Sequence, residues 1–184
     1  MSRVVLIGDA FVGKTALIKK YIERVTTPES YEATIGAAFQ TYQTDVNNEQ
    51  VTIQIWDTAG QEKFRALGPV YYRNSEAAVV VFDVTNAQTY ENVDGWIKRF
   101  QEIVPADIPI FIVGNKVDLP HPNFDENQVI DYCEDHDYKY FSTSALTGVG
   151  VNSLFQSVAD VVYKRGHQSI EAQQINKNTG SSCC

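Results

Sequence analysis

The sequence predicts an α/β fold in which a six-stranded, mainly parallel sheet has one antiparallel edge strand and helices on both faces. Two observations lead to this fold class. Short apolar runs of strand length alternate along the chain with segments of helical periodicity, and two adjacent segments have the alternating pattern of a hairpin. Strands that alternate with helices are joined by right-handed crossovers, which place helices on both faces of a parallel sheet.

The first half of the chain supplies a strand, a helix and the hairpin. Residues 3–7 are an apolar run that ends at Gly8, and residues 14–24 follow with apolar side chains at helical spacing. Residues 38–46 and 51–56 alternate apolar and polar side chains. The four residues between these two segments begin with two asparagines, which tolerate the left-handed conformation that a tight turn needs.

The second half of the chain continues the alternation of strands and helices. The longest apolar run begins the strand predicted over residues 77–83. Shorter runs predict two more strands, and apolar side chains at helical spacing predict three more helices. These strands are residues 108–114 and 138–142, and these helices are residues 90–101, 126–136 and 152–165.

We expect one folded domain over residues 1–165 and a disordered tail over residues 166–184. The tail is polar, and Ile170 and Ile175 are its only aliphatic residues larger than Ala. Such a segment cannot bury enough apolar surface to offset the entropy lost on ordering. An amphipathic helix docked on the domain is the alternative.

The composition excludes several classes of protein. Fifteen Lys and Arg against 23 Asp and Glu give a net charge of −8, which argues against sequence-independent binding to nucleic acid. No apolar run approaches the roughly 18–20 residues that span a bilayer. We recognise no secretory signal, and three cysteines do not make a disulfide framework. We therefore expect a cytoplasmic protein.

A phosphate-binding motif lies between the first strand and the first helix. Residues 8–15 have the sequence GDAFVGKT and match G-x-x-x-x-G-K-[ST]. The backbone N–H groups of such a loop surround phosphate oxygens, and the helix N-terminus adds partial positive charge. Lys14 is expected to reach the β- and γ-phosphates, and the Thr15 hydroxyl to coordinate Mg²⁺. The predicted phosphate contacts are Asp9, Ala10, Phe11, Val12, Gly13, Lys14 and Thr15.

A second phosphate-binding motif follows the third predicted strand, where residues 56–62 read WDTAGQE. Asp57 at the strand end can hold a Mg²⁺-bound water. The backbone N–H of Gly60 can approach a γ-phosphate closely because glycine has no Cβ. Alone this motif is weak evidence for phosphate binding, but the evidence is strong when a phosphate loop precedes it in the sequence.

Two further segments predict recognition of guanine. Residues 115–118 read NKVD and residues 144–146 read SAL, and each follows a predicted strand. The Asp118 carboxylate can accept hydrogen bonds from the N1–H and the exocyclic amine of guanine, a donor pair that adenine lacks. Lys116 can lay its methylene stem over the base, and Asn115 can tie this loop to the phosphate loop. The predicted contacts here are Asn115, Lys116, Asp118, Ser144, Ala145 and Leu146, with the Ala145 N–H as the main contact of its loop.

In this order and spacing the four motifs resemble those of the Ras superfamily, over about residues 3–165. Residues 34–39 (TIGAAF), residues 71–73 (YYR) and the Cys183–Cys184 pair are similar to the Rab family, and IGAAF resembles its early-endosomal branch. The resemblance implies a P-loop NTPase fold of the small G-domain type, followed by a hypervariable tail. It also implies slow hydrolysis of GTP in a cycle between GDP and GTP states.

The resemblance further implies roles for residues of two switch segments. Thr34 would complete the Mg²⁺ shell with Thr15 and Asp57. Tyr31 would close over the nucleotide, and Gln61 would orient the attacking water as the catalytic residue. The residues implied to bind effectors are Ile35, Phe39, Trp56 and Tyr71.

Partners and membrane attachment are implied in the same way. The expected partners are effectors, an exchange factor, a GTPase-activating protein and a prenyl-binding chaperone. Cys183 and Cys184 match the Rab pattern of two geranylgeranyl groups, and two lipid chains give stable anchoring where one is marginal. These features predict a switch in vesicle traffic, with endocytic membranes favoured, that cycles onto the cytosolic face of endosomal or other vesicle membranes. We assume a monomer, since the sequence has no clear mark of oligomerisation.

Three positions depart from the family pattern. Residues 25–28 lack the aromatic side chain that usually stacks on the guanine edge, so we expect faster nucleotide release than in a typical member. Phe11 places a ring in the phosphate loop where a small residue is usual, and we expect the ring to point outward. Leu146 stands where Lys is usual.

Two alternative functions remain. One is a guanine-nucleotide-binding module that recruits partners without hydrolysing GTP, against which Gln61 and Thr34 argue. The other is a GTPase of another Ras branch, such as a soluble nuclear-transport type, against which the Cys183–Cys184 pair argues.

Overall fold

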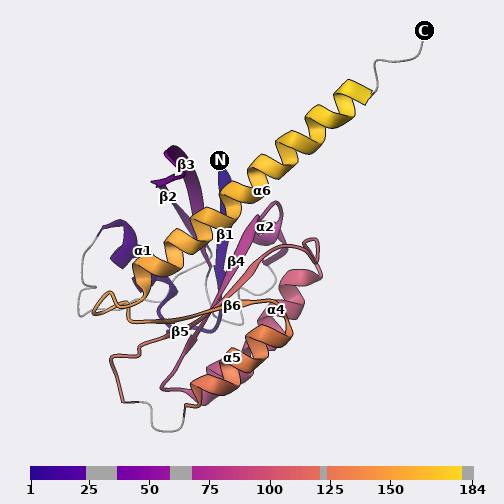
Figure 1. Ribbon diagram of the computed structural model, residues 1–184. Coiled ribbons are helices and arrows are strands. Elements are labelled where there is room, and N and C mark those ends of the chain that lie inside the picture. Colours follow the sequence, from indigo (N-terminus) through magenta and orange to yellow (C-terminus); the bar gives the residue numbers. More distant parts are fainter. Residues whose placement is uncertain (24–36, 59–67, 121–123, 180–184) are drawn as a thin grey trace.

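The computed structural model describes residues 1–23, 37–58, 68–120 and 124–179, and these residues form one sheet between two layers of helices (Figure 1). The strands are β1 (Ser2–Ile7), β2 (Ala37–Val46), β3 (Glu49–Thr58), β4 (Ala77–Asp83), β5 (Ile110–Asn115) and β6 (Lys139–Thr143). The helices are α1 (Lys14–Ile22), α2 (Gly68–Tyr72), α3 (Ala87–Glu91), α4 (Val93–Gln101), α5 (Glu126–Asp135) and α6 (Val151–Thr179).

The sheet confirms the predicted fold class. Its six strands lie in the order β2-β3-β1-β4-β5-β6. Strand β2 pairs antiparallel with β3, and the other pairs are parallel. The parallel strands therefore all end at the same edge, where the loops that follow them come together.

Side chains that alternate along the central strands fill two cores. Val4 and Leu6 of β1 pack with α1 and α6 on one face of the sheet. Val5 and Ile7 pack with α4 and α5 on the other face. Every residue of β4 is buried, as expected for a strand covered on both faces.

The hairpin turn is tighter than predicted. Val46 pairs with Glu49, so only Asn47 and Asn48 form the connection. Their φ angles are 52° and 65°. A two-residue hairpin turn of type I′ requires a positive φ at both of its central residues. Strand β3 consequently begins two residues before the predicted start at residue 51.

Helix α6 differs from the prediction, which ended it near residue 165 and left residues 166–184 disordered. The structure continues α6 through Thr179, and Figure 1 shows this part projecting beyond the sheet. A helix that is already nucleated adds residues at little cost when their intrinsic propensity is adequate. The continuation contains Glu, Ala, Gln and Lys, which favour helix. Helix propensity, rather than burial of apolar surface, accounts for this continuation.

Two smaller differences concern the other helices. The sequence did not predict α2, because five residues are too short to show a helical period. The single helix predicted over residues 90–101 is two helices, α3 and α4, which meet at Asn92. Helix α3 also begins earlier, at Ala87, where the Asn86 side chain accepts a hydrogen bond from the backbone N–H of Gln88.

The turn before α6 leads to a stability prediction. At Gly150, φ is +70° and an added Cβ would lie 2.0 Å from the Ser142 carbonyl oxygen. We expect Gly150→Ala to lower the free energy of unfolding by more than about 2 kcal/mol, since it combines backbone strain with a clash. Urea unfolding followed by circular dichroism measures the change.

Gly166 provides the matched control. It lies within α6, and an added Cβ would meet no described atom within 4 Å. Gly166→Ala should therefore raise the free energy of unfolding by about 0.5–1 kcal/mol, the usual gain at a helix interior. Equal stabilities of the two variants would contradict the assigned geometry of the turn.

Candidate functional site

The loops after β1, β3, β5 and β6 bring the described parts of the predicted motifs to one edge of the sheet. The phosphate loop follows β1, and Asp57 lies near the end of β3. Asn115 ends β5, and Ser144 follows β6. Because parallel strands carry their carboxyl ends to the same edge, motifs far apart in the sequence meet here.

The phosphate loop is folded around the ammonium group of Lys14. The Lys14 Nζ donates hydrogen bonds to the carbonyl oxygens of Gly8, at 2.9 Å, and Asp9, at 2.7 Å. Its side chain is 5% exposed. A buried cation at the N-terminus of α1 is suited to a polyanion, because the helix end adds positive potential to that of the side chain.

The two glycines of this loop leave room that a side chain would fill. An added Cβ at Gly8 would lie 2.1 Å from the Val81 carbonyl oxygen, and one at Gly13 would lie 2.3 Å from Asn115 Nδ2. Both residues also have positive φ angles, 136° and 100°. The loop can therefore keep this shape, with its backbone close to a ligand, only with glycine at these positions. The residues present fit a bound phosphate chain.

The predicted metal ligands Thr15 and Asp57 lie side by side. The Thr15 hydroxyl donates a 2.5 Å hydrogen bond to Asp57 Oδ2 and so ties α1 to β3. In the described residues no cluster of three or more His, Cys, Asp or Glu could hold a metal by itself. One hydroxyl and one carboxylate suit Mg²⁺, which commonly takes few protein ligands and completes its shell with phosphate and water oxygens.

Asn115 joins three loops of the site. Its Nδ2 donates to the Val12 carbonyl oxygen at 2.8 Å, which is the predicted tie to the phosphate loop. Its Oδ1 accepts from the Thr143 hydroxyl and from the Ala145 N–H, each at 3.1 Å. The Ala145 N–H, predicted to contact the base, is thus engaged with Asn115 in this structure.

Lys116 is anchored by an aspartate that the sequence analysis did not single out. Its Nζ forms a 2.5 Å ion pair with Asp83 at the end of β4. Asp83 Oδ1 also accepts from the backbone N–H and the hydroxyl of Thr85, at 2.9 and 2.6 Å. Burial alone would raise the pKa of the Asp83 carboxyl, but the bonds from Lys116 and Thr85 hold that pKa below its usual value. The sequence did contain a signal for Asp83, since it is an Asp at the end of a predicted strand, as Asp57 is.

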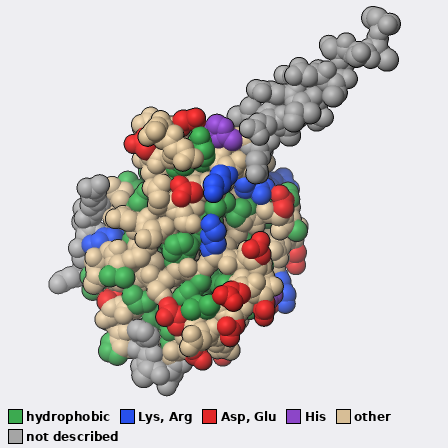
Figure 2. Space-filling view, in the orientation of Figure 1, with side chains coloured by type: hydrophobic (Ala, Val, Ile, Leu, Met, Phe, Trp, Pro, Cys, Tyr) green, Lys and Arg blue, Asp and Glu red, His purple; other side chains and the backbone are tan. Residues whose placement is uncertain are grey.

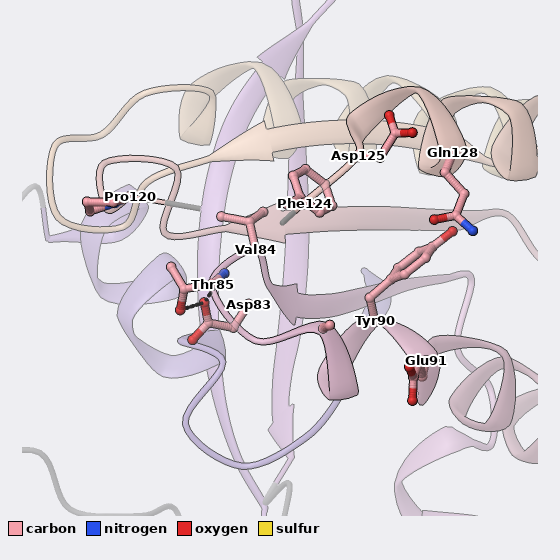
Figure 3. Close-up of a pocket in the computed structure, with 10 residues that line it drawn as sticks. Asp83, Val84, Thr85, Tyr90, Glu91, Pro120, Phe124, Asp125 and Gln128 are labelled. Carbon is pink, nitrogen blue, oxygen red and sulfur yellow. Dashed lines mark hydrogen bonds between the residues drawn. The ribbon is translucent and has the colours of Figure 1, made fainter. Parts of the chain in front are cut away.

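Asp83 also borders a second hollow, of about 270 Å³, between the β4–α3 connection and the start of α5 (Figure 3). The rings of Tyr90 and Phe124 line it and pack on Phe82, with centroids 5.2 and 5.7 Å apart. Lys116 does not line this hollow. The ion pair therefore joins the two hollows, because Asp83 lines this one and Lys116 lines the hollow that contains Asp118.

The hollow suited to a base has a volume of about 360 Å³ and lies between the phosphate loop and the loops after β5 and β6. It is lined by Phe11, Gly13, Ala16, Asn115, Lys116, Asp118, Leu119, Ala145 and Leu146. Asp118 is exposed at this hollow, where its carboxylate can accept hydrogen bonds from a ligand. Ser144 is buried, and its hydroxyl accepts from the Thr147 N–H, so it shapes the turn.

Asp9 contributes differently from its neighbours in the phosphate loop. Its carboxylate accepts hydrogen bonds from Asn92 Nδ2 at 2.7 Å and from Trp96 Nε1 at 2.8 Å. The side chain is therefore turned toward α4, and only its backbone is available to a phosphate. No local sequence pattern points to Asn92 and Trp96 as partners of Asp9, because they follow it by more than eighty residues.

The residues implied to bind effectors form a row of rings. Phe39 and Trp56 are cross-strand partners with ring centroids 5.2 Å apart, and Tyr71 lies 5.8 Å from Trp56. Phe39 is 54% exposed, and Val70 beside Tyr71 is 65% exposed. This row gives the described surface a contiguous aromatic strip suited to a protein partner.

Seven of the predicted site residues lie outside the described part of the chain: Tyr31, Thr34, Ile35, Gly60, Gln61, Cys183 and Cys184.

Comparison with known proteins gives a family and two relatives. Residues 3–164 match the sequence profile of the Ras family. The GTP-binding protein YPT53 of Saccharomyces cerevisiae is 41% identical over 168 residues, which cover 87% of this chain and 76% of the relative. The Ras-related protein Rab7 of Drosophila melanogaster is 40% identical over 162 residues, which cover 85% of this chain and 78% of the relative.

The burial of Lys14 predicts a pH dependence of phosphate binding. Burial lowers the pKa of Lys14 to about 8, although the carboxylates of Asp57 and Asp9 oppose the shift. Bound phosphates favour the charged ammonium, so the affinity for GDP should decrease as the pH rises through 8. The decrease should approach roughly tenfold per pH unit above that value.

Calorimetry at pH 8.5 in two buffers of different ionisation enthalpy should show proton uptake on binding of GDP. Lys14 is already charged at pH 7, so the uptake assigned to it should be small there. Equal uptake at the two pH values would contradict the assignment to Lys14.

Proposed function

This chain belongs to the Ras family and is a Rab-type small GTPase, and from that premise we propose that it cycles between GDP-bound and GTP-bound states as a switch in endocytic vesicle traffic. The observation that carries the proposal is the meeting of three features at one edge of the sheet. These are the loop around Lys14, the Thr15–Asp57 pair and the hollow that contains Asp118.

In this proposal the phosphate loop binds the β- and γ-phosphates. The backbone N–H groups of residues 9–13 surround the phosphate oxygens, and the Lys14 ammonium neutralises their charge. The hydrogen bonds from Lys14 to carbonyl oxygens support this role, because they hold the ammonium in place before a ligand arrives. Pre-organisation of this kind lowers the cost of binding.

Mg²⁺ would be held by the hydroxyls of Thr15 and Thr34 and through a water on Asp57. When bound, the metal supplies charge that stabilises the phosphate oxygens during transfer. The hydrogen bond between Thr15 and Asp57 supports the assignment, since it already brings two oxygen donors together.

We assign guanine recognition to the 360 Å³ hollow. Asp118 would accept two hydrogen bonds from the base, and the stem of Lys116 would cover one face of the ring. The ion pair of Lys116 with Asp83 supports this position of the stem, because it fixes the far end of the side chain. Asn115 keeps the loop that carries Asp118 at a constant distance from the phosphate loop.

Hydrolysis would depend on positioning and electrostatics rather than covalent chemistry. Gln61 would orient a water in line with the γ-phosphate, while Lys14 stabilises the charge on the transferred group. The sequence offers no arginine that matches a built-in finger. We therefore propose a slow reaction that an activating protein accelerates by on the order of 10³–10⁵-fold.

The switch would transmit the state of the phosphate to the aromatic strip of Phe39, Trp56 and Tyr71. Loss of the γ-phosphate removes contacts of Thr34 and Gly60, and their segments relax. Trp56 and Asp57 are consecutive residues of β3, so the metal-binding side chain and the effector surface share one rigid strand. Effectors would bind this strip only while the switch segments are ordered.

For the membrane step we propose that Cys183 and Cys184 carry two geranylgeranyl groups and that residues 166–184 separate these groups from the G domain. In the described part of the chain, no helix has the length and apolar character that crossing a bilayer requires. Attachment to endosomal membranes, an exchange factor, an activating protein and a prenyl-binding chaperone belong to the same proposal.

A change of one atom at Asp118 tests the assignment of the base. Asp118→Asn replaces an acceptor of two hydrogen bonds by an acceptor and a donor, which fits xanthine, whose C2 carries a carbonyl oxygen, and misfits guanine. We expect the affinity for GDP to decrease by at least 100-fold and that for XDP to increase. Competition binding measures both.

Asp125→Asn is the control for this change, because Asp125 lies in the second hollow. It should alter neither affinity. Undiminished GDP binding by Asp118→Asn would contradict the proposed site.

Single-turnover hydrolysis at controlled Mg²⁺ tests the proposed reaction. Bound GTP should convert slowly to GDP in the unmodified chain, and Gln61→Leu should reduce the rate at least tenfold because the attacking water loses its orienting amide. Chromatography of the bound nucleotide measures the conversion. Retention of GTP by both proteins would contradict hydrolysis by the chain without a partner.

A further inference from the structure

Two side chains of the α4 segment converge on the acidic side chain of the phosphate loop. Asn92 directly precedes α4 and Trp96 lies four residues later, so both project from the same face of the helix. Asn92 Nδ2 donates to Asp9 Oδ2 at 2.7 Å, and Trp96 Nε1 donates to Asp9 Oδ1 at 2.8 Å. Both oxygens of the Asp9 carboxylate are therefore held by α4.

The Asn92 side chain serves the phosphate loop instead of its own helix. An asparagine at the N-cap commonly accepts a hydrogen bond from a backbone N–H of the first turn. Asn86 does so for α3, whereas Asn92 occupies the N-cap of α4 and makes no such bond. The helix forgoes this cap, and the amide is committed to Asp9.

The packing of α4 fixes the direction of the second donor. Trp96 is 3% exposed, and its neighbours Val93 and Ile97 are buried in the same core. The Arg99 guanidinium lies over the Trp96 ring, 5.1 Å from its centroid. Because buried side chains pack closely and keep one rotamer, the indole N–H stays directed at Asp9.

The direction of the Asp9 carboxylate matters because the backbone of the same residue holds Lys14. The Asp9 carbonyl oxygen accepts a hydrogen bond from the Lys14 ammonium at 2.7 Å. A carboxylate turned toward that ammonium would compete with phosphate for its charge, and it would repel the phosphate oxygens. The two donors of α4 turn the negative charge the other way.

We propose that Trp96 and Asn92 are positioning residues for the bound nucleotide, which hold the Asp9 carboxylate away from the phosphates and leave the Lys14 ammonium to the ligand. This proposal rests on the guanine-nucleotide function proposed above and adds to it the residues that direct the charge of the phosphate loop. In this role neither residue touches the nucleotide, and both act through Asp9. Helix α4 thereby influences how long the phosphates stay bound.

Release of radiolabelled GDP from the full chain, chased with excess unlabelled GDP, tests the proposal. Trp96→Phe keeps an aromatic ring in the core but removes the indole N–H. It should release GDP about tenfold faster, since a hydrogen bond to a charged group is worth about this factor. Ile97→Val is the matched control, because it also removes atoms from the buried face of α4 but from a side chain that cannot bond Asp9. Its release rate should stay within about twofold of the unmodified chain.

The same substitutions in an Asp9→Ala chain separate positioning from packing. Without the carboxylate there is no charge to turn toward the phosphates, so adding Trp96→Phe should change GDP release by less than about twofold. Asn92→Ala should show the same pattern in the two backgrounds. A tenfold effect of Trp96→Phe in both backgrounds would overturn the proposal, because Trp96 would then act through the packing of α4.

A spectroscopic measurement reports on the hydrogen bond itself. The chain has two tryptophans, so the indole region of a heteronuclear NMR spectrum of the GDP-bound chain contains two N–H signals. The Trp96 proton, identified by its absence in Trp96→Phe, should move upfield in Asp9→Ala because it loses a charged acceptor. The Trp56 proton should stay in place, since Trp56 Nε1 donates to Gln54 Oε1. An unmoved Trp96 signal would overturn the proposal.

Failure of this proposal and failure of the proposed function give different results. If the unmodified chain retains GDP and Trp96→Phe releases it at the same rate, the positioning role is wrong and the proposed function stands. If the unmodified chain does not retain GDP at any Mg²⁺ concentration, the proposed function is wrong and the positioning role fails with it.

Discussion

The site depends on one buried amide, the side chain of Asn115. Asn115 is 1% exposed. Its side chain donates a hydrogen bond to the phosphate loop and accepts hydrogen bonds from Thr143 and Ala145. Each buried polar group left here without its hydrogen bond would lower the free energy of unfolding by about 1–3 kcal/mol. Gly13 has no Cβ, so the Asn115 amide can come close enough to donate a hydrogen bond to the Val12 carbonyl oxygen. The distance between the phosphate-binding and base-binding loops is therefore set by hydrogen bonds and not by loop length.

Charge is distributed unevenly around this framework. The chain has a net charge of −8, and Figure 2 shows acidic side chains gathered on the face that α5 covers. At the site, the Lys116 ammonium is neutralised by Asp83, while Lys14 is hydrogen-bonded to carbonyl oxygens that carry no net charge. A polyanion is thus attracted by Lys14, and Lys116 presents its apolar stem. Lys14 and Lys116 therefore have different roles because one is hydrogen-bonded to neutral carbonyl oxygens and the other is paired with a carboxylate.

Much of the fold followed from local patterns. Apolar runs located the strands, and two consecutive asparagines located the hairpin turn, because burial and backbone conformation act on neighbouring residues. The pattern failed for α2, whose five residues are too few to show a repeated helical period. It failed again for the end of α6, where helix propensity rather than burial extends the helix. Boundaries shifted by a few residues wherever pairing or capping, as at Asn86, decided the end of an element.

The sequence by itself determined the chemistry of the phosphate loop, since the glycines at positions 8 and 13 and the ammonium of Lys14 act within eight consecutive residues. Only the tertiary structure decided which distant side chains complete that loop. Asp9 is turned toward Trp96 in α4, and Phe11 lies on the rim of the base hollow. The physical reason is that parallel strands which pair in the sheet are far apart in the sequence, so a local pattern does not show which strands are neighbours. Their order in the sheet brings the loops together, and that order is set by packing across the whole chain.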